Sequence, residues 1–96
     1  MILYEGIHKF RRDKELLRPI VIDYASVSAL SPSELKVFVG DKLVEHVYVG
    51  IYSPHTWWGN NSLFGRNEPL PGEEFTVIVG KSAIFRIEGE WFEKVG

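Results

Sequence analysis

Two adjacent tryptophans, Trp57 and Trp58, are the residues of this sequence best suited to bind another molecule. They lie in the stretch 52–72, YSPHTWWGNNSLFGRNEPLPG, which is rich in glycine, proline and asparagine. Indole rings offer sugars and unpaired bases a flat face for stacking, and asparagine amides supply hydrogen bonds beside it. Neighbouring side chains of an extended chain point in opposite directions, so we expect one ring to be buried and one to be exposed. The predicted contact residues are Trp57, Trp58, His55 and Asn60, with Tyr48 and Tyr52 beneath them.

A second candidate is the basic stretch 8–18, which holds five Lys or Arg residues against two acidic ones. Cations interleaved with an aromatic ring are typical of nucleic-acid binding, because phosphates pair with the cations and bases stack on the ring. The chain as a whole has a net charge of −2, so no general basic field attracts nucleic acid. The nucleic-acid contacts predicted by this alternative are Lys9, Phe10, Arg11, Arg12 and Lys14.

Catalysis and metal binding find little support in the residue pattern. There is no cysteine, and His8, His46 and His55 lack the close spacing of metal ligands. The serines lie mostly at turn signals, and neither a Gly-x-Ser-x-Gly motif nor a phosphate-binding glycine loop is present. Glu73 and Glu74 are adjacent, and in a strand they would face opposite ways. We therefore predict a protein that is not an enzyme and has no cofactor and no metal.

Two similar segments give the clearest architectural signal. ELKVFVGDKLVEHV at 34–47 and EFTVIVGKSAIFRI at 74–87 align without a gap at a 40-residue offset. Each has alternating apolar residues, a glycine-initiated turn and a second apolar run, which predicts a β-hairpin. We expect Gly40 and Gly80 to have positive φ in these turns. The likeness is typical of any two hairpins with the same turn chemistry, and internal duplication is the less favoured explanation.

The remaining segments also favour strands. Residues 1–10 predict a short strand bent at Gly6, and 18–28 predict a second strand. Residues 8–17 fit either a hairpin or a short helix, of which we prefer the hairpin. Residues 43–52 predict a long strand whose core face comprises Leu43, Glu45, Val47, Val49 and Ile51.

The predicted fold is a single all-β domain over residues 1–96, with a long aromatic loop at 52–72. We expect a small antiparallel β-sandwich of six or seven strands, and the alternative is a five-stranded barrel of the OB or SH3-like kind. The predicted function is a binding or assembly module that contacts another protein, or copies of itself, through the aromatic loop. Carbohydrate or another small ligand is the first alternative, and nucleic acid is the second. No apolar run approaches 18 residues, so we expect no membrane span and a cytoplasmic protein, with a mature secreted form left open.

Overall fold

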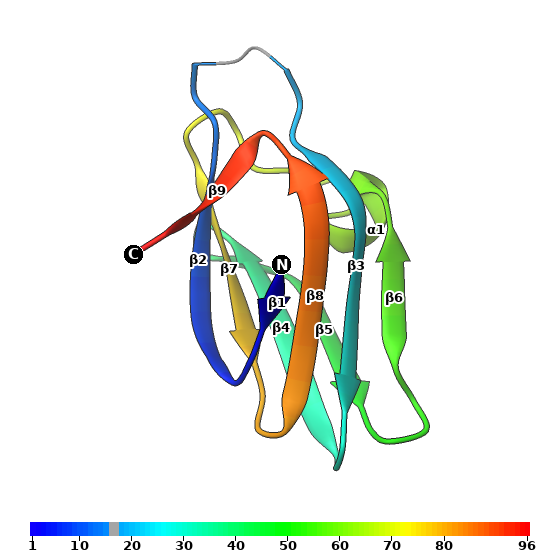
Figure 1. The fold of residues 1–96 in the computed structure, drawn as a ribbon. Helices are drawn as coiled ribbons and strands as arrows, with labels where there is room; N and C mark the ends of the chain where they lie inside the picture. Colours follow the sequence, from blue (N-terminus) through cyan, green and yellow to red (C-terminus); the bar gives the residue numbers. More distant parts are fainter. Residues whose placement is uncertain (16–17) are drawn as a thin grey trace.

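Two antiparallel sheets pack face to face as an open β-sandwich (Figure 1). The computed structural model describes residues 1–15 and 18–96, and at residue 61 it describes the backbone alone. One sheet has the strand order β1-β8-β3-β6 and the other has the order β5-β4-β7-β2-β9. The elements are β1 (Ile2–Leu3), β2 (Gly6–Arg12), β3 (Val21–Ala29), β4 (Ser33–Val39), β5 (Lys42–Val49), β6 (His55–Trp58), α1 (Asn60–Leu63), β7 (Glu74–Val79), β8 (Ala83–Glu90) and β9 (Phe92–Val95).

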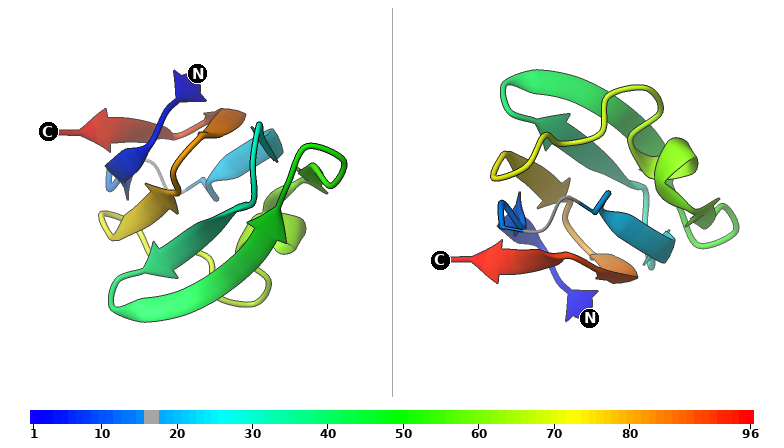
Figure 2. Two further views of the ribbon diagram at one scale, coloured as in Figure 1. Left: turned by 90° about the horizontal axis from the view of Figure 1, so that it is seen from below. Right: turned by 90° about the horizontal axis from the view of Figure 1, so that it is seen from above.

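The predicted all-β sandwich is confirmed, and the alternative barrel is wrong because the two sheets do not close on each other. The described residues form nine strands rather than six or seven, since β1, β6 and β9 are short segments that the alternation did not separate. In the end-on views of Figure 2, α1 lies beside β6 at the margin of the sandwich. The edge formed by β6 is therefore accompanied by a short helical turn.

The core lies between the sheets and is built by the alternation of apolar residues along each strand. In β4 and β7, every second side chain is buried, which the patterns ELKVFV and EFTVIV dictate. Aromatic rings fill one end of this space: the rings of Phe10 and Phe75 stack with centroids 5.0 Å apart, and Phe64 meets Phe75 edge to face at the same distance. The described residues bury no charged side chain completely.

The two similar segments lie side by side, but they do not form two hairpins. The 34–47 hairpin is confirmed, because β4 pairs with β5 and Gly40 has a φ of 58° in the turn. The 74–87 hairpin is wrong, because β7 lies in one sheet and β8 in the other. Both sides of β7 are already occupied by β2 and β4, so β8 must cross the sandwich. Val37 lies directly opposite Val77, so the similar segments pair with each other.

The expected positive φ at Gly80 is also wrong. In the turn between β7 and β8, the left-handed residue is Ser82, with a φ of 64°. A glycine is required at position 80 for a different reason: the backbone there passes so close to β4 that no side chain fits. Its amide donates a hydrogen bond to the carbonyl oxygen of Glu34 at 2.9 Å. A Cβ atom at position 80 would lie 2.5 Å from Oγ of Ser33.

Over residues 8–15, which the structure describes, neither the predicted hairpin nor the predicted helix is found. Residues 8–12 belong to β2, which pairs with β7 and β9, whereas β3 lies in the opposite sheet. The segment therefore connects the two sheets instead of turning back as a hairpin, and its first half is not helical. The register that places Phe10 opposite Phe75 explains this, because it buries both rings in the core. Residues 16–17 of this prediction lie outside the described residues.

The predicted strand at 43–52 is shorter than expected, and its alternation is interrupted. A bulge places Glu45 opposite Val37 and Leu43 opposite Phe38, so Val44 is the extra residue. As a result, Leu43 is exposed, while Val44 packs against the core together with Val47. Val49 is buried as predicted, but Ile51 lies beyond the end of β5 and is exposed.

The stretch 52–72 is not an irregular loop throughout. It contains β6, which pairs with β3, and the helical turn α1. Gly59 and Gly65, with φ values of 83° and 61°, let the chain turn sharply before and after α1. Leu63 and Phe64 are fully buried, so they fasten this stretch to the core.

Candidate functional site

Strand β6 forms one margin of its sheet and carries the tryptophan pair. Its register against β3 places Trp58 opposite Tyr24 and Thr56 opposite Ser26. Within the described residues β6 pairs with β3 alone, so the other side of its backbone faces outward (Figure 1). An edge strand of this kind offers free N–H and C=O groups to which another extended chain can pair.

The two indole rings have different environments, as the alternation predicts. Trp57 is 3% exposed and packs against Phe85, with ring centroids 6.5 Å apart. Trp58 is 71% exposed. Trp57 is therefore a core residue that anchors β6, and of the two predicted contact rings only Trp58 is available to a partner.

The Trp58 ring does not stand alone on the surface. Its centroid lies 5.7 Å from that of Tyr24 on the neighbouring strand, and the two rings are tilted by 43°. We did not predict Tyr24 as a site residue, because its position beside Trp58 depends on the pairing of β3 with β6. The contact restricts the orientation of the indole, so the exposed ring is held in place before any partner arrives.

Asn60 has a structural role instead of a free amide. Its side-chain oxygen accepts a hydrogen bond from the backbone N–H of Ile22, and its side-chain nitrogen donates to the carbonyl oxygen of Ile20. The amide thus joins the start of α1 to the start of β3. Both polar ends are used within the protein, which removes Asn60 from the set of contact residues.

The other three predicted contact residues are exposed but do not form one cluster beneath the tryptophans. His55 lies at the start of β6 with its ring 4.5 Å from that of Trp57. Tyr52 is 91% exposed in the connection before β6. Tyr48 is on β5 in the opposite sheet, where its exposed ring lies 4.8 Å from His46. The expectation that both tyrosines lie beneath the tryptophans is wrong, because both side chains are exposed and Tyr48 belongs to the other sheet.

The four sheet margins of the described strands differ in how they discourage pairing. β1 is only two residues long, β5 carries Lys42, Glu45 and a bulge, and β9 carries Glu93 and Lys94. Short length, charge and bulges are the usual devices that keep edge strands from pairing with other chains. β6, with the sequence His-Thr-Trp-Trp, has no Lys, Arg, Asp or Glu and no bulge against β3. Among these margins it is the only one longer than two residues that carries neither a charge nor a bulge.

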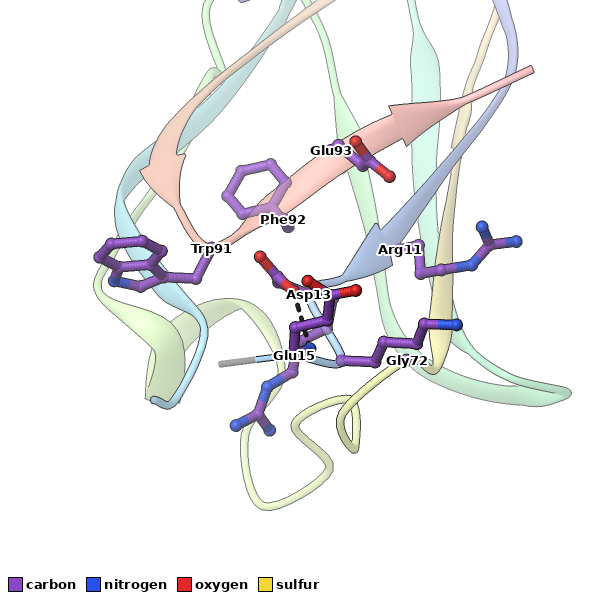
Figure 3. A pocket seen from close by; sticks show the side chains of 9 residues that line it. Arg11, Asp13, Glu15, Gly72, Trp91, Phe92 and Glu93 are labelled. Carbon is purple, nitrogen blue, oxygen red and sulfur yellow. Dashed lines mark hydrogen bonds between the residues drawn. The ribbon is translucent and has the colours of Figure 1, made fainter. Parts of the chain in front are cut away.

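The basic stretch lines a separate cavity of about 570 Å³ at the opposite side of the sandwich. Figure 3 shows Trp91 and Phe92 on one side of this cavity, Arg11 on the other and Asp13 between them. The lining comprises Arg11, Arg12, Asp13, Lys14, Glu15, Gly72, Trp91, Phe92 and Glu93. Three basic residues thus face three acidic ones, so the cavity has no net positive charge to attract a phosphate chain.

The individual residues of the basic stretch are also engaged elsewhere. Phe10 is fully buried, which makes it unavailable for stacking with a base. Arg11 forms an ion pair with Glu74 at 3.3 Å. Arg12 donates hydrogen bonds to the carbonyl oxygens of Pro69 at 2.7 Å and Arg18 at 2.8 Å. Lys9 and Lys14 are exposed, and within the described residues the structure shows no hydrogen bond or ion pair from either side chain. Of the five predicted nucleic-acid contacts, these two alone remain available.

His8 and His46 have separate hydrogen-bond partners. Nε2 of His8 lies 2.7 Å from the carbonyl oxygen of Tyr4, and Nε2 of His46 donates to Oε2 of Glu34 at 2.9 Å. The hydrogen bond from His46 lowers the pKa of Glu34 below its usual value of 4.5. Over residues 1–15 and 18–96, no group of three or more His, Asp or Glu side chains is placed to hold a metal ion.

Comparisons with protein-family models, with curated proteins and with solved structures found no match to this chain. In the part of the chain that the structure describes, no helix is long and apolar enough to cross a membrane.

Proposed function

We propose that this protein is a non-enzymatic binding module that contacts another polypeptide by adding its extended chain to β6. One observation carries the proposal: Trp58 is 71% exposed on an edge strand that has none of the usual charges or bulges. Strand addition supplies main-chain hydrogen bonds, and a neighbouring side chain supplies the specificity. Trp58, fixed against Tyr24, is the side chain positioned for that second role.

The energetics favour the Trp58 ring as the main contact. A tryptophan side chain buries roughly 150–250 Å² when it is covered, and apolar burial contributes roughly 25 cal/mol per Å². Covering the exposed ring therefore contributes on the order of 4 kcal/mol, before the cost of ordering the partner is subtracted. Tryptophan is among the residue types that most often dominate the binding energy of protein interfaces.

The structure offers less to the alternative ligands. A sugar bound on Trp58 needs polar groups beside the ring, but the Asn60 amide is already bonded to the backbone of Ile20 and Ile22. A nucleic acid needs several unpaired cations, but Arg11 is paired with Glu74 and Arg12 is bonded to backbone carbonyl groups, which leaves only Lys9 and Lys14 of the predicted contacts. These contacts are the reason for preferring a polypeptide partner.

A displayed library of short linear peptides tests the proposal directly. Peptides selected on the wild-type protein should lose binding to Trp58→Ala and to Thr56→Lys, because the first removes the ring and the second places a charge on the edge. Ser28→Lys is the matched control, since Ser28 is also exposed but lies on β3, away from the free edge. Peptide binding that is indifferent to both β6 substitutions would reject the proposal.

A further inference from the structure

We infer that the extended chain added to β6 is β6 of a second copy of this protein, paired antiparallel about a two-fold axis that passes beside Trp57. The inference rests on the proposed function, because it names the partner of the same edge. Joining two four-stranded sheets in this way would create one continuous sheet across the dimer.

The lack of charged residues on β6 favours a second copy as its partner. Two copies that meet through the same surface present identical sets of charges to each other, and like charges that come to lie directly opposite are destabilising. β5 and β9 both carry acidic and basic side chains, whereas β6 has no Lys, Arg, Asp or Glu. A distinct partner commonly gains specificity from complementary charges, and β6 offers none for that purpose.

The register of two paired β6 strands is restricted by symmetry. A two-fold axis perpendicular to the sheet keeps the outer face of one copy level with the outer face of the other. Residues that lie opposite each other must therefore belong to the same face. Trp58 and Thr56 alternate with Trp57 and His55, of which Trp57 points into the core. This condition leaves two registers that engage most of the strand, one centred on Trp57 and one centred on Thr56.

The register centred on Trp57 is the better of the two. It places Trp58 opposite Thr56 of the second copy, so that a large side chain lies beside a small one on the exposed face. The register centred on Thr56 places Trp58 opposite Pro54 instead, and proline has no N–H group to donate to a partner strand. The preferred pairing therefore covers the Trp58 side chain of each copy, one on either side of the two-fold axis.

The test begins with the molecular mass. Sedimentation equilibrium of the wild-type chain over a range of concentrations should show a monomer that becomes a dimer. Thr56→Lys should shift the dissociation constant upward by at least tenfold, while Ser28→Lys, which adds the same charge to the same face away from the edge, should leave it unchanged. Thermal unfolding of each variant checks that the fold is retained.

Disulfide crosslinking tests the register, and the absence of native cysteine makes the result unambiguous. Side chains opposite each other on paired strands have Cβ atoms about 4.5–5.5 Å apart, which is close to the separation that a disulfide requires. A mixture of Thr56→Cys and Trp58→Cys chains should form the mixed dimer on oxidation. Thr56→Cys alone should crosslink only if the register is centred on Thr56, which would overturn the preferred pairing.

The outcomes separate this inference from the proposed function. A wild-type chain that is monomeric at every concentration, but still binds selected peptides through β6, overturns the second copy as partner and leaves the proposed function standing. A dimer that persists in Thr56→Lys also overturns the inference. A monomer that binds no peptide through β6 rejects both.

Discussion

Trp57 donates its indole Nε1–H to Oε2 of Glu45 at 3.1 Å, so that a side chain of β6 reaches a strand of the opposite sheet. The contact joins the margins of the two sheets on the side where β6 is exposed. It also gives the buried indole nitrogen a partner inside the protein, as such a group requires. The edge proposed for binding is thus held in place from within the core.

Removing this hydrogen bond should destabilise the fold. Glu45→Ala leaves the Trp57 indole N–H without an acceptor, and we expect the free energy of unfolding to fall by about 1–3 kcal/mol. Glu45→Gln keeps an oxygen in the same position and should cost less. Urea unfolding of both variants measures the difference, and equal losses would show that the amide oxygen of the introduced glutamine does not replace the carboxylate.

The two tryptophans should respond very differently to truncation. Trp57→Ala removes a buried ring, and we expect a loss of about 3–5 kcal/mol in the free energy of unfolding. Trp58→Ala removes an exposed ring and its contact with Tyr24, which should cost no more than about 1.5 kcal/mol. Chemical denaturation compares the two variants at a dilution where the protein is monomeric. Similar losses would contradict the assignment of Trp58 to the surface.

Gly80 should be intolerant of a side chain because of close approach to β4. A Cβ atom there would lie 2.5 Å from Oγ of Ser33 and 2.6 Å from the carbonyl oxygen of Glu34. We expect Gly80→Ala to lower the free energy of unfolding by about 1–3 kcal/mol. Gly50→Ala is the control, since a Cβ atom there meets nothing within 4 Å, and its effect should stay within about 0.5 kcal/mol. Equal melting temperatures for the two variants would refute this account.

The pair of Glu34 and His46 should make a small contribution to acid sensitivity. The folded-state pKa of Glu34 is lowered, mainly by the hydrogen bond from His46, relative to a usual value of 4.5. A depressed carboxyl pKa stabilises the fold above the unfolded value, and that contribution is lost as the pH falls through the folded value. Glu34→Gln should therefore lower the melting temperature near neutral pH and make it less dependent on pH below about 4.5. A variant whose acid-side profile parallels that of the wild type would exclude this role.

The sandwich was predictable because alternation along a strand is a local property of the sequence. The patterns ELKVFV and EFTVIV determine which side chains face inward, and both strands form as expected. The opposite burial of Trp57 and Trp58 follows from the same rule.

The predictions that were wrong depend on which strands are neighbours in the sheets. The 74–87 hairpin was wrong because β2 and β4 already occupy both sides of β7, and no local pattern contains that information. The exposure of Leu43 follows from a bulge, which likewise arises from pairing. Tyr24 was missed as the neighbour of Trp58 for the same reason, since the pairing of β3 with β6 brings these distant residues together.

The most direct test of the proposed binding edge is the accessibility of Trp58 before and after a partner is bound. In a Trp91→Phe background, acrylamide quenching of the dilute protein should reveal one accessible tryptophan, Trp58, and one protected tryptophan, Trp57. Adding a tryptophan-free peptide selected on the wild-type protein should protect Trp58 and leave Trp57 unchanged. A Trp58 signal that is still fully quenched when the peptide is bound would contradict the assignment of β6 as the binding edge.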